Sequence, residues 1–283
     1  MSEPPDIRRD PHLGTLVHVV GTRQARPNLP ATGCPFCVGG VEAPEPYDVR
    51  WFHNRWPAMP DERCEVVLYT PQHEATFPSL GVDGARKVID LWAARTAALG
   101  ARDDVHFVLV FENRGPEVGA TIAHPHGQIY AYDHIPERQL RLATAPWAPD
   151  ADPGERLVCE AGGWRATVPY ASTYPIAIDI SPVERVPDLP SCSPTQRDGL
   201  AAILVDLLAR LDGLHDRPLP YMMWIDQRPT DGGEWPDAWM HIEIVSPWRS
   251  AGVPRFIAAA ELGAGEYFNP VLPEALADDL RRC

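Results

Sequence analysis

The chain has 283 residues, and 45% of them are hydrophobic, which is enough for one large or two smaller domains with a substantial core. Its 25 Lys and Arg residues stand against 39 Asp and Glu residues, for a formal net charge of −14. This balance argues against a general nucleic-acid binder, which needs a basic surface. The single lysine, Lys87, also argues against Schiff-base chemistry and against a P-loop.

The N-terminal residues lack the positive and apolar regions of a secretory signal peptide. No apolar run approaches the roughly 20 residues that cross a bilayer. We therefore expect a cytoplasmic protein with no membrane partner. In that reducing compartment the six cysteines are better explained as thiols or metal ligands than as disulfides.

Cys34-Pro-Phe-Cys37 is a Cys-x2-Cys pair, whose spacing lets both thiolates reach one zinc ion. A redox pair is the alternative explanation. The pair sits in a loop rich in Gly and Pro, and not ahead of a helix in a βαβ pattern. This context favours the metal.

A strand from Cys64 to Thr70 that ends in a proline turn is the first predicted core element. Apolar residues at helical spacing predict a helix over about 83–99. A buried strand follows over 105–111. The loop 112–115 is then expected to turn the chain, so that the next segment forms a neighbouring strand.

The run 119–128, Gly-Ala-Thr-Ile-Ala-His-Pro-His-Gly-Gln, carries the strongest chemical signal. On an extended segment His124, His126 and Gln128 share one face. Two imidazoles and an amide that face one cleft suit a covalent phosphoryl carrier. One ring attacks phosphorus, its surroundings fix its tautomer, and the amide holds a phosphate oxygen. An ordinary pair of polar strand residues is the alternative, and the neighbouring Gly, Gln and Thr121 weigh against it.

The second half repeats this order of elements. A strand over 174–181 again ends in a proline turn, and a helix over about 193–214 opens with Ser193-Pro-Thr-Gln as N-cap and first turn. Strands follow over 221–225 and 239–245. Two such copies predict an α+β protein whose halves form a mostly antiparallel sheet flanked by helices. The acidic, Pro- and Gly-rich segment 145–163 is the expected seam.

The 119–128 run resembles the active-site motif of the galactose-1-phosphate uridylyltransferase family, a branch of the histidine-triad superfamily. The similarity extends over about 22–282 and includes further motifs in the same order: Arg23-Gln-Ala-Arg26-Pro, Cys34-Pro-Phe-Cys37, Asn54, Thr70-Pro-Gln-His73, Val110-Phe-Glu-Asn113-Arg-Gly, and Arg255-Phe256 with Glu261. The resemblance implies two histidine-triad-like halves, which we place at 1–150 and 151–283. The second half has His241-Ile-Glu243 where the first has His124-Pro-His126, so we expect it to be chemically degenerate.

The resemblance also implies a set of metal ligands. His73 and His124 align with the family's two zinc histidines, and with Cys34 and Cys37 they complete a Cys2His2 set suited to a structural Zn²⁺. Spare candidates are His53 and Cys64. Family members often carry a second metal, bound by one Glu and three His. The matching residues here are too poor in ligands to predict a second site: Leu142, Asp226, His241 and Glu243.

The implied activity is nucleotidyl transfer by double displacement. An NMP group, by resemblance UMP, moves from a nucleoside diphosphate sugar to a sugar 1-phosphate through a covalent nucleotidyl-histidine on His126. Gln128 and Thr121 match the residues that hold the phosphoryl oxygens. The residues that the resemblance assigns to substrate binding are Arg23, Arg26, Asn54, Asn113, Arg255, Phe256 and Glu261.

The chain departs from the family pattern at Arg55, where the family has aspartate, and at Ala260 and Tyr267, where it has tyrosine and glutamine. A sugar phosphate other than galactose 1-phosphate is therefore an open alternative. Two other functions also stay open: a phosphorylase of a nucleotide sugar or dinucleoside polyphosphate, and a zinc-stabilised nucleotide-binding module without turnover. The related enzymes are dimers with shared sites, so we expect a homodimer in which 255–261 reaches the partner's His126.

Overall fold

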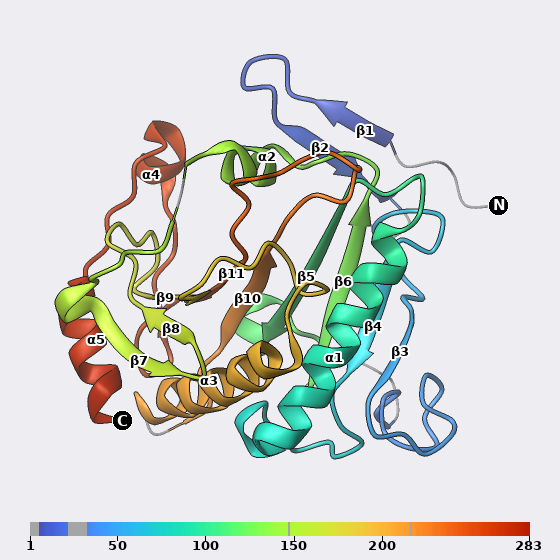
Figure 1. Cartoon of the computed structure of the whole chain (residues 1–283), viewed down its shortest axis with the longest axis horizontal. Coiled ribbons are helices and arrows are strands. Elements are labelled where there is room, and N and C mark those ends of the chain that lie inside the picture. Colours follow the sequence, from blue (N-terminus) through green and yellow to red (C-terminus); the bar gives the residue numbers. More distant parts are fainter. Residues whose placement is uncertain (1–5, 22–32, 147, 216) are drawn as a thin grey trace.

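The computed structural model describes residues 6–21, 33–146, 148–215 and 217–283. Nine strands form one antiparallel sheet in the order β3-β4-β6-β5-β10-β11-β9-β8-β7 (Figure 1). Four come from the first half of the chain: β3 (Arg50–His53), β4 (Cys64–Leu68), β5 (Phe107–Arg114) and β6 (His126–Tyr132). Five come from the second half: β7 (Leu157–Ala161), β8 (Trp164–Thr167), β9 (Ile176–Pro182), β10 (Tyr221–Asp226) and β11 (His241–Ser246).

The two halves contain the repeat that the sequence predicts. Each has a strand, a long helix and two further strands: β4, α1 (Gly81–Gly100), β5 and β6, and then β9, α3 (Pro194–Gly213), β10 and β11. In the sheet these strands lie in mirrored order, β4-β6-β5 followed by β10-β11-β9, and the halves join where β5 pairs with β10. The α+β prediction of an antiparallel sheet flanked by helices is confirmed.

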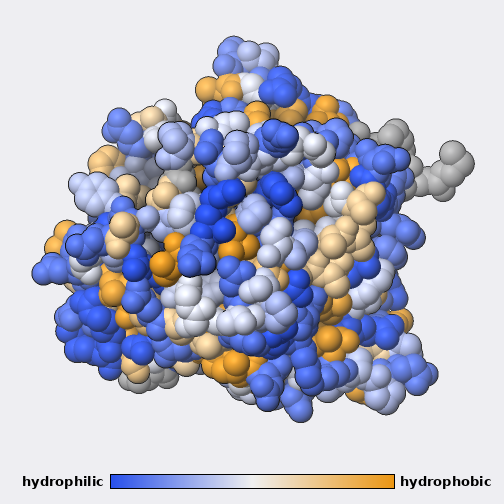
Figure 2. Space-filling view, in the orientation of Figure 1, coloured by the Kyte–Doolittle hydropathy of each residue, from blue (hydrophilic) through white to orange (hydrophobic). Residues whose placement is uncertain are grey.

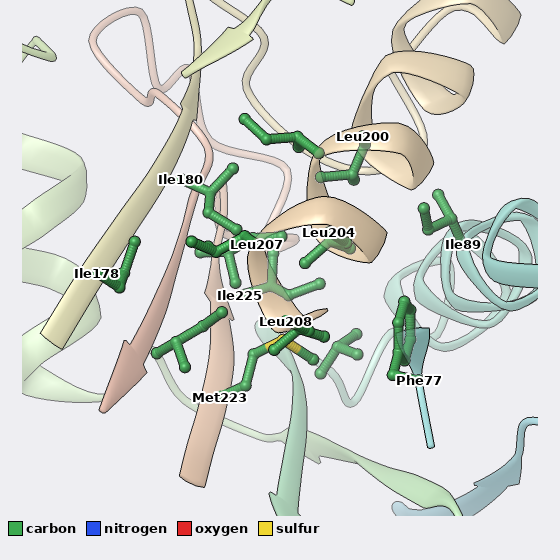
Figure 3. Packing of buried hydrophobic residues seen from close by; sticks show 14 of the residues in the cluster. Phe77, Ile89, Ile178, Ile180, Leu200, Leu204, Leu207, Leu208, Met223 and Ile225 are labelled. Carbon is green, nitrogen blue, oxygen red and sulfur yellow. The ribbon is translucent and has the colours of Figure 1, made fainter. Parts of the chain in front are cut away.

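One face of the sheet is covered by α1 and α3, which pack against each other. The core between them and the sheet is aliphatic and aromatic, with Leu204, Leu207 and Leu208 of α3 facing Ile178, Ile180 and Ile225 of the strands (Figure 3). Along a strand the core residues lie two positions apart, as Ile178 and Ile180 do, because successive side chains point to opposite faces of the sheet. The same alternation places every second residue of β5, β6, β10 and β11 on the opposite face.

Helix α3 begins where the sequence predicts. The Ser193 hydroxyl accepts the backbone N–H of Gln196, and the Gln196 side chain accepts the backbone N–H of Ser193, which together form a capping box. Gly199 in its first turns touches Gly162 of the β7–β8 turn so closely that a Cβ there would lie 2.1 Å from the Gly162 carbonyl oxygen. Glycine at both positions lets the hairpin pack directly on the helix.

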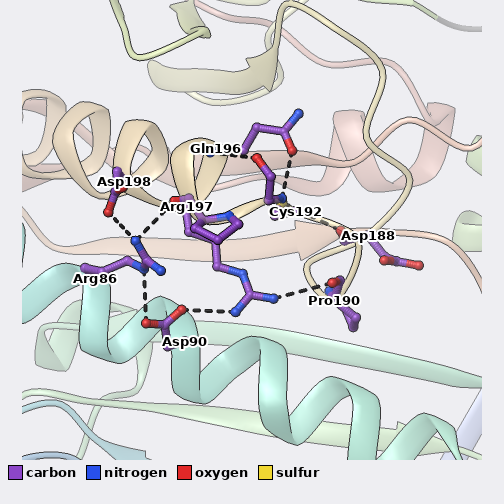
Figure 4. Close-up of polar contacts among 10 residues, drawn as sticks. Arg86, Asp90, Asp188, Pro190, Cys192, Gln196, Arg197 and Asp198 are labelled. Atoms are coloured by element: carbon purple, nitrogen blue, oxygen red, sulfur yellow. Dashed lines mark hydrogen bonds and ion pairs between the residues drawn. The ribbon is translucent and has the colours of Figure 1, made fainter.

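Ion pairs join α1 and α3 at their exposed sides. Arg86 contacts Asp90 and Asp198, and Arg197 donates to Asp90 at 3.0 Å (Figure 4). Such pairs contribute little individually because water competes for both charges. The face of the molecule shown in Figure 2 is mostly hydrophilic, with hydrophobic residues in small separate areas.

The remaining elements lie around the sheet. They are the hairpin β1 (Asp6–Arg9) and β2 (Leu16–Val19), the short pair β12 (Trp248–Ser250) and β13 (Val253–Pro254), and the helices α2 (Glu137–Thr144), α4 (Ala259–Ala264) and α5 (Pro273–Arg282). Within the described ranges no helix is long and apolar enough to cross a membrane. The described residues include all six cysteines, and none of these forms a disulfide.

The predicted turn after β5 is misplaced. The sequence suggests that the chain turns from Glu112, but β5 continues through Arg114 and the turn begins at Gly115, whose φ is 95°. The reason is tertiary. Glu112, Asn113 and Arg114 pair with Met223, Met222 and Tyr221 of β10, and this pairing extends the strand.

Candidate active site and metal centre

Strand β6 places His126 and Gln128 on the face of the sheet opposite α1 and α3. Between them Gly127 points into the core, where a Cβ would lie 2.2 Å from the hydroxyl oxygen of buried Tyr69. Glycine is therefore required at this position because no side chain fits. The packing of the core thus explains the glycine between His126 and Gln128, and the strand alternation leaves both of these side chains on the same face.

The His126 ring is oriented by the backbone. Its Nδ1 lies 2.8 Å from the carbonyl oxygen of His124, so Nδ1 must carry the proton and donate it. The neutral ring then has its lone pair on Nε2. The edge-to-face contact with Phe36, at 5.0 Å between ring centroids, restrains the ring further.

His126 and Gln128 open onto a cavity of about 590 Å³. Its polar side chains include Asn54 and Thr121, which the sequence assigns to the site. Asn54 donates to the side-chain oxygen of Gln128 at 3.3 Å. The apolar part of the lining includes Phe36, Val38, Val41, Phe52, Trp56 and Val66. A cavity of this size with an apolar wall and a few polar groups suits a nucleotide-sized ligand.

His124 does not share the face of His126 and Gln128, so that expectation is wrong for this residue. It precedes β6, is fully buried, and directs its Nδ1 toward Cys34 Sγ at 3.8 Å and Cys37 Sγ at 3.7 Å. His73 Nδ1 lies 3.6 Å from Cys37 Sγ. These four residues, predicted as metal ligands from the sequence, offer ligand atoms that all lie within 4.8 Å of one another.

Groups behind the cluster orient His124. Its Nε2 lies 2.7 Å from the carbonyl oxygen of Thr70 and 3.0 Å from the hydroxyl of Tyr47. The Nε2–H therefore bonds to the Thr70 carbonyl, and the Nδ1 lone pair is available to a metal. Burial lowers the pKa of His124, which favours the neutral ring that a metal requires. No sequence pattern pointed to Tyr47, because it contacts the cluster only through the tertiary structure.

The other candidate substrate residues of the first half fall into two groups. Asn113 lies on the same face of the sheet, two residues beyond Phe111, which pairs with Gln128, but it does not line the cavity. Arg23 and Arg26 lie outside the described residues.

Arg255, Phe256 and Glu261 do not reach the cavity of their own chain. Arg255 pairs with Glu261, whose carboxylate also accepts the backbone N–H groups of Ala258 and Phe268, each at 3.0 Å. These contacts hold the start of α4, which lies far along the sheet from β3 and β4 (Figure 1). Phe256 is 78% exposed. Within one chain, Arg255 and Glu261 are structural, and Phe256 faces outward.

A second cluster lies on the same sheet face in the second half. Asp226, His241 and Glu243 offer ligand atoms within 4.8 Å of one another. Arg138 of α2, which the sequence did not single out, pairs with both Asp226 and Glu243 and so places a cation between the carboxylates. Burial raises the pKa of Asp226 to about 6, whereas His241 and Arg138 outweigh burial and lower the pKa of Glu243 to about 2. Leu142 lies beside this cluster and has no ligand atom.

Two family models match this chain, and their matches overlap at residues 123–136. Residues 53–136 match the model of the galactose-1-phosphate uridyl transferase N-terminal domain, and residues 123–282 match that of its C-terminal domain. The galactose-1-phosphate uridylyltransferase of Thermotoga maritima is 32% identical over 98% of both chains. The one from Streptomyces lividans is 34% identical over 98% of this chain and 86% of its own length. A solved uridylyltransferase structure is 26% identical, superposes with a TM-score of 0.89, and covers 98% of this chain and 97% of its own.

Proposed function

This chain belongs to the galactose-1-phosphate uridylyltransferase family, and on that premise we propose that it transfers a nucleoside monophosphate group between a nucleoside diphosphate sugar and a sugar 1-phosphate. UMP is the group to test first, because the relatives are named for uridylyl transfer. The observation that carries the proposal is the hydrogen bond from His126 Nδ1 to the carbonyl oxygen of His124.

This hydrogen bond prepares His126 as a nucleophile. With the proton held on Nδ1, the Nε2 lone pair attacks the α-phosphorus, an N–P bond forms, and the P–O bond to the sugar 1-phosphate breaks. The leaving group departs as a phosphate dianion and needs no proton. A second sugar 1-phosphate then attacks the same phosphorus and displaces Nε2. The ring carries one extra positive charge in the intermediate, which the carbonyl of His124 stabilises.

Neighbouring side chains bind the phosphoryl oxygens in this proposal. The Gln128 side-chain oxygen accepts from Asn54, which orients its amide so that the NH₂ group can donate to a phosphoryl oxygen. The Thr121 hydroxyl lines the same cavity. We assign Asn54 and Asn113 to substrate contacts, and Arg23 and Arg26 to the phosphates as guanidinium donors.

The metal of the Cys34, Cys37, His73 and His124 cluster is proposed to be a structural Zn²⁺. Tetrahedral zinc with Zn–S of about 2.3 Å and Zn–N of about 2.0 Å separates sulfur from nitrogen by roughly 3.5 Å. The observed Sγ–Nδ1 distances of 3.6–3.8 Å fit that geometry. Four protein ligands leave no open position, so the ion would order the loop and the strand and would take no part in transfer.

For the sugar end we propose a homodimer. Arg255, Phe256 and Glu261 are remote from the cavity of their own chain, and Phe256 exposes most of its ring. A second copy that brought this segment to the partner's His126 would bury Phe256 and close the cavity. The proposed site of action is the cytoplasm.

Intact-mass spectrometry tests the chemistry directly. The chain is incubated with UDP-, GDP- or ADP-sugars without acceptor, and we expect a mass increase equal to one nucleoside monophosphate, which also identifies the base. Chase with sugar 1-phosphates or with inorganic phosphate then separates a transferase from a phosphorylase. Absence of any adduct with all three nucleotide classes would contradict the proposal.

A further inference from the structure

The nucleotide cavity contains one carboxylate among its described lining residues, that of Glu42, and one guanidinium, that of Arg55. The two form an ion pair of 3.0 Å between Arg55 Nη2 and Glu42 Oε1. The Glu42 side chain is 18% exposed and the Arg55 side chain 53%. The Glu42 carboxylate is therefore better shielded from solvent than the Arg55 guanidinium, which lies nearer the surface.

The loop that carries Glu42 is held firmly. The backbone N–H of Glu42 donates to the Pro35 carbonyl oxygen at 3.0 Å, and its own carbonyl accepts from Arg50 Nε at 3.0 Å. The chain passes so close to itself here that a Cβ on Gly40 would lie 2.5 Å from the Pro35 carbonyl oxygen. This loop follows directly on the Cys34–Cys37 pair. The two candidate cysteine ligands and Glu42 thus belong to one folded loop, and the backbone that carries the Glu42 carboxylate is held in place by the fold.

Glu42 lines the same cavity as the reacting histidine, and contacts connect the two parts of its wall. Gln128, two residues from His126 on the same strand face, binds Asn54, and the residue after Asn54 is Arg55, which binds Glu42. On the nucleoside side of the phosphorus that His126 attacks, the ribose is the nearest part of the ligand, and its two hydroxyls are donors that suit a carboxylate in this cavity. The apolar wall of the cavity can pack against the flat faces of a base. Among the described lining residues the cavity contains no second carboxylate.

We infer that Glu42 recognises the ribose of the nucleotide, its carboxylate accepting hydrogen bonds from the 2′- and 3′-hydroxyls, and that Arg55 holds the carboxylate in place. Carboxylates are well suited to a vicinal diol because two oxygens accept from two adjacent donors, as in dinucleotide-binding proteins. Hydrogen bonds to a charged acceptor are also stronger than those between neutral groups. The inference rests on the proposed function and adds a preference for ribonucleotides over 2′-deoxyribonucleotides.

The experiment compares binding of UDP and 2′-deoxy-UDP to the full-length, metal-loaded chain by calorimetry, with the GDP and ADP pairs measured alongside. For the base that binds most tightly, we expect the wild type to prefer the ribonucleotide by about tenfold or more. Glu42→Gln has the same shape and should reduce that preference to about threefold or less. The matched control is Glu45→Gln, an exposed residue of the same loop that does not line the cavity, and it should keep the wild-type preference.

The outcomes separate the inference from the proposed function. Equal binding of ribo- and deoxyribonucleotide by the wild type, or an unchanged preference in Glu42→Gln, would overturn the role of Glu42 while nucleotide binding itself stands. Failure of all three diphosphates to bind would remove the proposed function and the inference together. A fold defect is detected by comparing the melting temperatures of Glu42→Gln and Glu45→Gln.

Discussion

The carbonyl oxygen of His124 accepts the Nδ1–H of His126, at 2.8 Å, while the His124 ring itself faces the two cysteine sulfurs of the metal cluster. The candidate nucleophile is therefore oriented by the backbone of a candidate metal ligand. Pro125 between them fixes its own φ and biases His124 toward extended conformations, which limits the motion of the link. A metal ion bound to the His124 ring would also restrain the His124 carbonyl. It would thereby help to keep the proton of His126 on Nδ1.

The first prediction concerns the nucleophile. His126→Gly should lower transfer by on the order of a thousandfold or more, because no other residue supplies the attacking nitrogen. Metal content and melting temperature should stay close to wild type, since His126 is not in the metal cluster. Added imidazole should restore part of the activity by filling the vacated space. The exposed His12→Gly is the control and should keep full activity. A nucleotidyl adduct on the His126→Gly protein would refute the assignment.

The second prediction concerns the metal. Cys34→Ser should lower bound zinc and the free energy of unfolding, the latter by about 2 kcal/mol or more, because the ion's binding energy contributes to folding. Metal analysis and thermal melts measure the two effects. Cys283→Ser, at the exposed C-terminal residue, should change neither. Full zinc occupancy in Cys34→Ser would show that this cysteine is not a ligand.

The third prediction follows from buried Glu112, whose carboxylate accepts from the Tyr221 hydroxyl at 2.8 Å. Burial raises the pKa of Glu112 to about 7, although the Tyr221 hydroxyl and Arg114 oppose the shift. A carboxyl with a raised pKa stabilises the fold fully below its unfolded pKa of about 4.5, and this stabilisation is lost as pH rises through 7.

Wild type should therefore lose about 2 kcal/mol of unfolding free energy relative to Glu112→Gln between pH 5 and pH 8. Urea denaturation of both proteins at several pH values measures the difference, and groups common to the two cancel. Parallel stability profiles would mean that Glu112 titrates near its ordinary pKa.

The fourth prediction tests the shared site. Phe256→Ala should weaken binding of the sugar phosphate with little effect on melting temperature, because the ring is 78% exposed. Glu261 is less suitable for this test, since its carboxylate holds α4. Mixing Phe256→Ala with His126→Gly should produce heterodimers with one intact site and recover some activity. If each chain uses its own Phe256, mixing will restore nothing. A fully active monomer in light scattering would also rule out sharing.

The fifth prediction concerns the second cluster. Because the Arg138 guanidinium lies between Asp226 and Glu243, we expect the wild type to bind no additional divalent cation there. Arg138→Ala leaves two carboxylates and His241, a ligand set that suits Mn²⁺. Excess MnCl₂ should then raise the melting temperature of this variant by about 3 °C or more. Arg141→Ala, on the same helix and paired with Glu137 at the surface, is the control. No response in Arg138→Ala would show that the three side chains do not converge on an ion.

Short-range patterns in the sequence determined much of the secondary structure and several of the candidate site residues. Helical spacing located α1, the Ser193 cap located the start of α3, and apolar runs, two of them ending in proline turns, located strands of the sheet. These signals depend on residues within a few positions of one another. The Cys-x2-Cys spacing identified Cys34 and Cys37 as candidate ligands, and the His-Pro-His-Gly-Gln run pointed to a nucleophilic histidine, for the same reason. The family resemblance supplied His73 and His124 as the other two ligands. The four predicted metal ligands do lie together.

Only the tertiary structure decided the remainder, since the contacts involved join residues far apart in the chain. Pairing with β10 extended β5 through Arg114, and the turn of His124 toward Cys34 and Cys37 removed it from the face of His126. Arg138 and Asp226 are 88 positions apart in the chain, and no local sequence pattern predicts their contact. The Glu42–Arg55 pair likewise joins the loop that follows Cys37 to the segment that follows β3. Ion pairs formed by tertiary packing follow no sequence periodicity. The partner of such a charged residue can therefore be identified only from the tertiary structure.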